Sequence, residues 1–178
     1  MYSFRNDYSE GAHPKVLQAL ADTNLRQTVG YGMDPCCQAA ADTIRRLCAA
    51  PDAAVHFLVG GTQVNLVTID AFLQSYEAVV AAQTGHVSTH ETGAIEATGH
   101  KVLTAPAADG KLTVDLIRQV YEANQEEHTP RPRLVYISNS TELGTIYTKG
   151  ELSAIYDYCK AHGIDLPFSA DSSYSRDR

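Results

Sequence analysis

The sequence predicts an α/β protein built on a mainly parallel sheet with flanking helices. Short apolar runs rich in β-formers alternate with amphipathic stretches along the chain, an alternation typical of βαβ units. The connections between the runs are of helix length, as right-handed crossovers between parallel strands require. With 178 residues, 44% of them hydrophobic, the chain can bury a sizeable core.

The first half of the chain supplies two helices and three strands to this scheme. Asp34 followed by Pro35 is a cap followed by a first-turn proline, so a helix is expected over about 35–49. The run "TQVNLVTIDAFLQSY" (62–76) predicts the second helix. The strands expected here are "AVHFLV" (54–59), "EAVVAA" (77–82) and "KVLTAP" (101–106).

The second half continues the alternation. Thr113 begins a helix whose apolar face includes Leu116 and Val120, and "RLVYIS" (133–138) predicts a strand. A last helix ends at Gly163, where a C-cap glycine belongs, and its apolar stripe is Leu152, Ile155, Tyr156 and Cys159. The segment "IDLPF" would begin one more strand, and the tail from about Ser169 is expected to be irregular.

Composition excludes several classes of partner. The net charge of −7 argues against nucleic acid or an anionic membrane as a partner. Without a signal-peptide pattern or an apolar run of about 20 residues, a cytoplasmic location is expected. The four cysteines predict buried free thiols. No metal is expected, because "HVSTHE" lacks the HExxH order of zinc proteases.

One point of the chain has the character of an anion site. "FLVGGTQVNL" ends an apolar run in Gly60, Gly61 and Thr62 and then turns into the helix expected over 62–76. Glycines let an anion approach the backbone N–H groups at the positive end of a helix. An ordinary β–α turn with Thr62 as N-cap is the alternative. No lysine follows the glycines, so a nucleotide-binding P-loop is not expected.

Four stretches together resemble the threonine aldolase branch of the pyridoxal-phosphate enzymes, within the β-eliminating lyase group. They are "VGYGMDP" (29–35), "GGTQVNL" (60–66), "TGHVSTHETGAIEATGHKV" (84–102) and "YISNSTELGTIY" (136–147). The resemblance runs from about Phe4 to about Ile164. It implies that residues 1–168 form the N-terminal part of a large domain of aspartate-aminotransferase-like fold type I, followed by a divergent tail over 169–178.

The resemblance also implies roles at the cofactor. The phosphate-binding turn falls on Gly61 and Thr62, with Gly60 before them. The histidine that stacks on the cofactor ring, and lies near the substrate Cα for proton transfer, falls on His86.

Three further positions carry expectations from the family. Ser9 is the candidate contact for the substrate carboxylate, and Glu142 stands where other members place a substrate-side residue. Asp171 is the candidate partner of the pyridine nitrogen, although it lies about two residues from the expected spacing and no Gly-Ala-Arg follows it.

The implied activity is cleavage of a small β-hydroxy amino acid, such as threonine, to glycine and an aldehyde, in a homo-oligomeric enzyme of amino-acid metabolism. The family places the lysine that holds the cofactor covalently beyond Asp171, whereas all five lysines here precede it. The chain is therefore expected to be a truncated copy of such a lyase. The alternative is a non-catalytic remnant or a phosphate-binding fragment.

Overall fold

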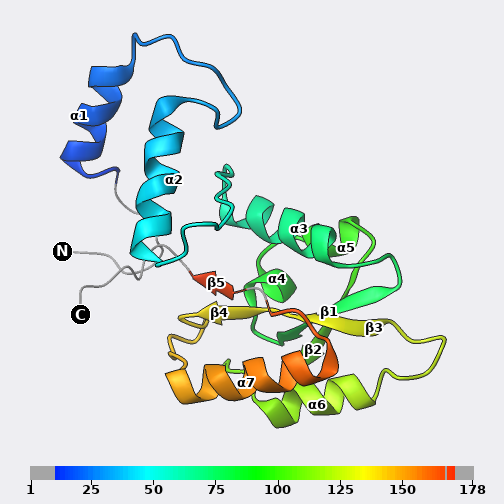
Figure 1. Ribbon diagram of the computed structural model, residues 1–178. Helices are drawn as coiled ribbons and strands as arrows, with labels where there is room; N and C mark the ends of the chain where they lie inside the picture. The colour runs from blue at the N-terminus through cyan, green and yellow to red at the C-terminus, as the bar shows by residue number, and fades with distance from the viewer. Residues whose placement is uncertain (1–10, 167, 171–178) are drawn as a thin grey trace. The chain divides into compact units, whose positions relative to one another are not determined.

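The computed structural model describes residues 11–166 and 168–170 (Figure 1). The chain divides into two compact units, residues 1–58 and 59–178. Within the described residues, no helix is both long and apolar enough to cross a membrane.

The described part of the first unit, residues 11–58, contains two helices, α1 (Pro14–Thr23) and α2 (Pro35–Leu47). The Asp34 carboxylate accepts from the N–H groups of Cys36 and Cys37 at 2.8 and 3.0 Å, so the predicted cap and proline do begin α2. The helix ends at Leu47, two residues early, and Ala49 has a φ of 51° that no α-helix continues. The helix α1 was not predicted from the sequence, and it buries no residue.

The strand expected over 54–59 is not formed. The segment has no regular structure, and the Val59 side chain is 96% exposed. A strand requires a neighbour for its backbone hydrogen bonds, and the described residues provide none here. The Val59 N–H donates instead to Gln63 Oε1 at 2.9 Å, a local contact at the start of the next helix.

The second unit is built on parallel strands, as predicted. One sheet has the order β2–β1–β3, from β1 (Glu77–Ala82), β2 (Lys101–Ala105) and β3 (Arg131–Val135). A second pair joins β4 (Ile137–Asn139) to β5 (Phe168–Ala170). All three pairings are parallel. The central strand β1 is buried along its whole length, as its alanine and valine content requires.

The single strand expected over 133–138 is divided into β3 and β4. The chain changes its partner here, because β3 pairs with β1 whereas β4 pairs with β5. Tyr136 stands at the change, and its N–H still donates to Val80 O of β1 at 2.8 Å. A hydrophobic run shows that a segment is buried but does not show where its partner changes.

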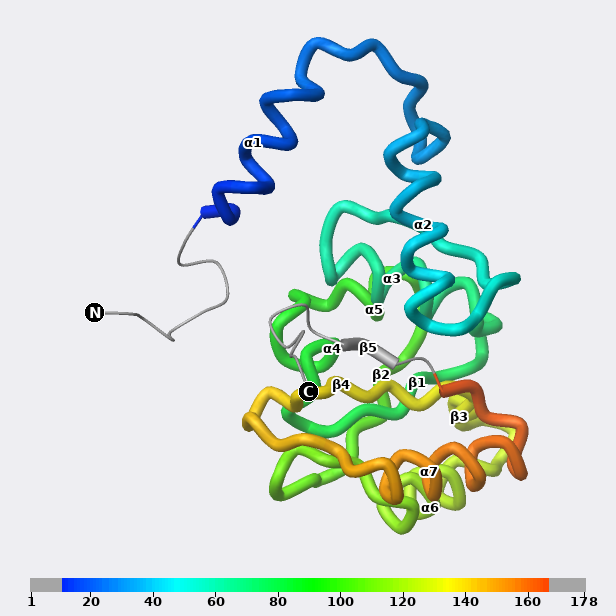
Figure 2. Tube along the Cα trace, turned by 60° about the vertical axis from the view of Figure 1, so that its left-hand side comes forward, coloured from blue at the N-terminus to red at the C-terminus, as the bar shows by residue number. Residues whose placement is uncertain are grey.

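In the described part of the second unit, five helices cover the strands. They are α3 (Gly61–Phe72), α4 (His86–Thr89), α5 (Ala94–Ala97), α6 (Val114–Glu122) and α7 (Lys149–His162). Figures 1 and 2 show α3 and α5 on one side of the strands and α6 and α7 on the other. The predicted parallel sheet with flanking helices is confirmed.

Alternate residues of β1 pack into two different hydrophobic clusters. Val80 and Ala82 face Ile117 of α6 and Ile155 of α7 in the first cluster. Val79 and Ala81 join Ile69, Leu73, Val87 and Ile95 in the second. This division follows from the two-residue period of a strand. Cys159 is buried in the first cluster as expected, but Cys36 and Cys48 are exposed, so their predicted burial is wrong.

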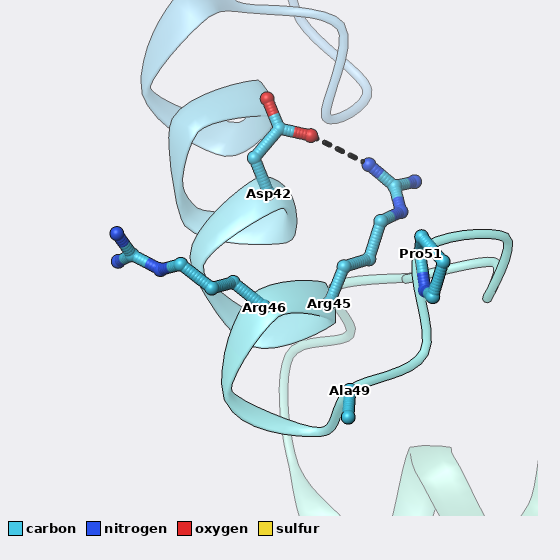
Figure 3. Close-up of a pocket in the computed structure, with 5 residues that line it drawn as sticks. All are labelled: Asp42, Arg45, Arg46, Ala49 and Pro51. Carbon is cyan, nitrogen blue, oxygen red and sulfur yellow. Dashed lines mark hydrogen bonds and ion pairs between the residues drawn. The ribbon is translucent and has the colours of Figure 1, made fainter.

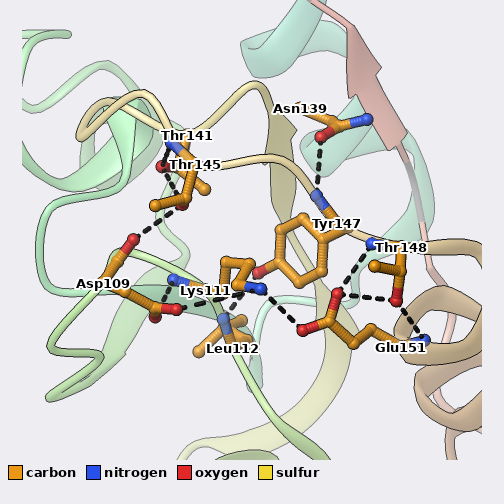
Figure 4. Close-up of polar contacts among 9 residues, drawn as sticks. All are labelled: Asp109, Lys111, Leu112, Asn139, Thr141, Thr145, Tyr147, Thr148 and Glu151. Carbon is orange, nitrogen blue, oxygen red and sulfur yellow. Dashed lines mark hydrogen bonds and ion pairs between the residues drawn. The ribbon is translucent and has the colours of Figure 1, made fainter.

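A polar network joins the loop after β2 to the start of α7 (Figure 4). Thr148 and Glu151 form the capping box of α7, and Lys111 Nζ lies 2.6 Å from Glu151 Oε1. The Lys111 ammonium lowers the pKa of Glu151 to about 2, assisted by hydrogen bonds from Thr148. The buried Tyr147 hydroxyl accepts from the Leu112 N–H at 2.5 Å. Burial raises the pKa of Tyr147 to about 12.

Candidate functional site

The site is built where the central strand β1 ends. The chain turns through residues 83–85 and begins α4 at His86. The turn is tight at Gly85, whose N–H donates to Ala82 O at 2.8 Å. A Cβ at position 85 would lie 2.9 Å from that same Ala82 oxygen, a distance real Cβ atoms do not tolerate. Glycine is therefore required to place His86 directly beyond the carboxyl end of a parallel strand, where α/β proteins bind ligands.

His86 is held at both its backbone and its ring. Its N–H donates to Glu142 Oε1 at 2.7 Å, and its ring Nδ1 lies 2.7 Å from Glu91 Oε1. The His86 side chain is 43% exposed, whereas that of Glu91 is fully buried. The His90 ring stands nearby, 5.6 Å away between ring centroids and tilted by 56°. The imidazole is therefore fixed in position but still accessible from solvent.

Two other elements extend this contact into a polar network. Asn65 of α3 donates from Nδ2 to Glu91 Oε1 at 2.6 Å, and lies 3.4 Å from the Tyr136 hydroxyl. Ser138 of β4 donates to Glu142 Oε1 at 2.9 Å, and its Oγ lies 3.2 Å from the Tyr136 hydroxyl. Residues far apart in the sequence thus converge on His86 from α3, from β4 and from the loop after β4.

Glu91 is unusual among these groups because one of its oxygens is unsatisfied. Oε1 accepts from Asn65 and lies 2.7 Å from His86 Nδ1, while the buried Oε2 has no hydrogen-bond partner among the described residues. Burial of a carboxylate without full hydrogen bonding costs free energy. A residue that carries this cost is a candidate for a role other than stability.

The glycines of the predicted anion site lie at the start of α3. Gly60 is the N-cap, in extended conformation, and Gly61 is the first helical residue. Thr62 therefore lies inside the first turn, and the alternative that made it the N-cap is wrong. The helix has no side-chain cap, so its first N–H groups are left for another acceptor.

The surroundings of the two glycines agree with a ligand that approaches the backbone. Gly60 and Gly61 are exposed, and a Cβ at either would meet no atom within 4 Å. Neither glycine has a positive φ. Packing and backbone strain within the described chain thus do not demand glycine, and the space over the helix start is open to an anion.

Of the three further residues expected at the site, one lies in the described chain beside His86. Glu142 is brought to His86, through the hydrogen bond to its backbone. Ser9 and Asp171 lie outside the described residues. Four polar residues of the network were not singled out in the sequence: Asn65, Glu91, Tyr136 and Ser138. Both Asn65 and Glu91 stand in stretches that carry the family resemblance, Asn65 within "GGTQVNL" and Glu91 five residues after His86. That position in the sequence was the signal that could have identified them as site residues.

A hollow of about 360 Å³ lies elsewhere, in the first unit (Figure 3). It is lined by Asp42, Arg45, Arg46, Ala49 and Pro51. Arg45 is already engaged, with NH1 2.8 Å from Asp42 Oδ1 and Nε donating to Ala53 O at 2.8 Å. None of the residues expected from the sequence lines this hollow. The described residues also contain no group of three or more potential ligands that could hold a metal ion.

Comparison with known proteins defines the family. A family model described as Beta-eliminating lyase matches residues 4–172. The chain belongs to the β-eliminating lyase family. Its relatives include the low-specificity L-threonine aldolase of Pseudomonas sp. (strain NCIMB 10558), which is 38% identical over 165 residues. That match covers 92% of this chain and 47% of the aldolase.

Solved structures agree with the family assignment. A threonine aldolase from Leishmania major is 55% identical, with a TM-score of 0.92 over 94% of this chain and 49% of its own. An archaeal alanine:glyoxylate aminotransferase is 12% identical, with a TM-score of 0.64 over 86% of this chain and 39% of its own, a likeness that shows the fold alone. This β-eliminating lyase chain thus matches fold type I pyridoxal-phosphate enzymes over part of their length, and it spans about half the length of its aldolase relatives.

A third kind of match is much shorter. Over 22 residues, the chain is 86% identical to the argininosuccinate synthase of Agathobacter rectalis, covering 12% of this chain and 5% of that protein. So short a match shows no second family.

Proposed function

We propose that this chain is the N-terminal half of a pyridoxal-phosphate-dependent lyase of the low-specificity threonine aldolase type. The observation that carries the proposal is His86, held at its backbone and its ring beyond the end of β1 and still 43% exposed. In the same unit, the N-terminus of α3 has no side-chain cap, and the space around its two glycines, Gly60 and Gly61, is unoccupied by other atoms of the described chain. The substrate would be a small β-hydroxy amino acid such as threonine, and the products glycine and an aldehyde.

The residues present fit the phosphate and the ring of the cofactor. The N–H groups at Gly61 and Thr62, with Gly60 before them, would hold the phosphate through the positive end of α3. The His86 imidazole would lie against the pyridine face. When bound, the cofactor supplies the acceptor for the electrons of the broken Cα–Cβ bond.

The chain's own residues would orient the substrate and move a proton. His86, fixed by Glu91 and Glu142, is positioned to accept or return a proton beside the substrate. Glu142 remains the proposed substrate-side residue, since its carboxylate is only partly buried. Ser9 is proposed to bind the substrate carboxylate and Asp171 the pyridine nitrogen. A homo-oligomer is proposed for the full-length enzyme.

The experiment combines binding with turnover. The purified chain is titrated with pyridoxal phosphate, followed by the absorption of the cofactor, and is then incubated with threonine while acetaldehyde is measured. We expect saturable binding that His86→Ala and Gly61→Val weaken, because they remove the stacking ring and obstruct the phosphate. Arg118→Ala, an exposed substitution on α6, is the matched control.

Turnover is expected to be absent or slow in the chain alone, because the family's cofactor-binding lysine is placed beyond Asp171. Cofactor binding unaffected by His86→Ala and Gly61→Val would contradict the proposed site. Sustained acetaldehyde release with a borohydride-trapped lysine would show that one of the five lysines present serves instead. No binding at all would favour the alternative, a non-catalytic remnant.

A further inference from the structure

We propose that Glu91 is a positioning residue, which keeps the proton of the neutral His86 ring on Nδ1 and so leaves Nε2 as the basic nitrogen. Asn65 assists by holding the Glu91 carboxylate. The inference rests on the proposed function for its use in catalysis, but the hydrogen-bond arrangement itself can be tested without cofactor.

The direction of the hydrogen bond follows from the third member of the network. Asn65 Nδ2 is a donor and lies 2.6 Å from Glu91 Oε1, so this oxygen acts as an acceptor. His86 Nδ1 lies 2.7 Å from the same oxygen. A second group that shares an acceptor oxygen at this distance must itself donate. Nδ1 therefore carries the proton, and the neutral ring has its lone pair on Nε2.

The burial of Glu91 favours the tautomer of His86 with its proton on Nδ1. The Glu91 side chain is fully buried, so water does not compete for Oε1, whereas the His86 side chain is 43% exposed. Glu142 Oε1 accepts the His86 backbone N–H and is itself held by a hydrogen bond from Ser138. The backbone is thus fixed by one carboxylate and the ring by another, which leaves the ring little freedom to rotate.

The unsatisfied oxygen of Glu91 supports a functional reason for its presence. Glu91 Oε2 is buried with no hydrogen-bond partner in the described part of the chain. An apolar residue of similar volume would avoid that cost. Carboxylates that orient an imidazole and fix its protonated nitrogen are a general device in proteins that use histidine as a base.

The tautomer can be measured directly in the whole chain. The ¹⁵N chemical shifts and long-range ¹H couplings of the imidazoles are recorded at alkaline pH, where the rings are neutral, and His86 is assigned from the spectrum of His86→Asn. We expect a protonated Nδ1 and an unprotonated Nε2. In Glu91→Leu we expect the populations to reverse, so that the Nε2–H form predominates. In Asn65→Ala we expect a smaller loss of the Nδ1–H form.

Two controls separate positioning from general destabilisation. Glu96→Gln changes an exposed acid of α5 and should leave the His86 tautomer unchanged. Far-UV circular dichroism shows whether each variant is folded. If Glu91→Leu fails to fold, the native chain and Asn65→Ala decide the question.

A predominant Nε2–H form in the native chain would overturn the proposal. So would an unchanged Nδ1–H form in folded Glu91→Leu. A fixed Nδ1–H tautomer in a chain that binds no pyridoxal phosphate would refute the proposed function and leave the positioning role of Glu91 intact.

Discussion

The position of His86 depends on the glycine that precedes it, Gly85. Gly85 allows the chain to turn back on Ala82 immediately after β1, and the turn determines where the imidazole stands. Gly60 and Gly61 differ from it, because they have open space around them and ordinary φ values. Packing therefore requires glycine at position 85 but not at positions 60 and 61.

Gly85→Ala is expected to destabilise the chain by about 1–3 kcal/mol, because the new methyl would overlap the Ala82 carbonyl oxygen. Urea unfolding followed by circular dichroism measures the change. Gly61→Ala is the matched control, since alanine there meets no atom within 4 Å and improves helix propensity by about 0.5–1 kcal/mol. Equal stabilities for the two variants would show that the turn can relax.

The same Gly61→Ala variant separates stability from binding. Its methyl group projects beside the N–H groups proposed for the phosphate, so cofactor or inorganic phosphate should bind more weakly although the fold is not weakened. Isothermal titration with phosphate, compared between the native chain and Gly61→Ala, measures the effect. Binding as tight as that of the native chain would place the anion elsewhere.

At the scale of elements, the start of α7 is connected to the loop after β2 by Tyr147, Lys111 and Glu151. Tyr147→Phe removes the oxygen that accepts the buried Leu112 N–H and should cost about 1–3 kcal/mol. Tyr156→Phe, at a tyrosine 53% exposed on α7, is the control and should change the unfolding free energy by less than about 0.5 kcal/mol. A similar small change for both would mean that water replaces the lost hydroxyl.

The charge pair of this network predicts a pH dependence. The pKa of Glu151 is lowered from 4.5 to about 2 in the folded chain, mainly by Lys111. A lowered folded-state pKa stabilises the fold above the unfolded pKa, and the stabilisation is lost as the pH falls from 4.5 towards 2. Glu151→Gln keeps a side chain able to complete the capping box but loses this dependence.

Urea unfolding midpoints measured between about pH 6 and pH 2 test this expectation, because the change of stability with pH reports the difference in bound protons between the unfolded and folded chains. The native chain should lose more stability across that interval than Glu151→Gln. Glu127→Gln, in the exposed loop before β3, should follow the native chain. Parallel curves for the native chain and Glu151→Gln would show that the pair is screened by solvent.

The sequence was sufficient for the elements whose signals are local. In the sequence, Asp34 with Pro35 predicted the start of α2, Gly163 predicted the end of α7, and "EAVVAA" matched β1 residue for residue. The structure confirms the role of Gly163, whose φ is 64°. The strand over 54–59 was wrong because strand formation depends on a neighbour, which no local pattern encodes. Asn65 and Glu91 were missed for the same reason, since their contact spans 26 residues.

At the scale of the whole molecule, both hydrophobic clusters belong to the second unit. Every buried member of them lies between Ile69 and Ile164, whereas Ala41 is the buried residue recorded in the helices of the first unit. A chain that begins at Val59 should therefore fold by itself. Its urea unfolding should be cooperative, with a free energy within about 1 kcal/mol of that of the whole chain. A non-cooperative transition would show that the first unit contributes to the core.

The parallel pairing of β1 has a consequence for synthesis on the ribosome. Val80 pairs with Leu103 on one side and with Val135 on the other, so the second neighbour of this strand is made 55 residues later. At translation rates of about 5–20 residues per second, that delay is roughly 3–11 seconds. The edge of "EAVVAA" that β3 will cover lacks its neighbour throughout this time, and both edges lack one until Leu103 has been made. We expect it to be the segment of the growing polypeptide that chaperones hold.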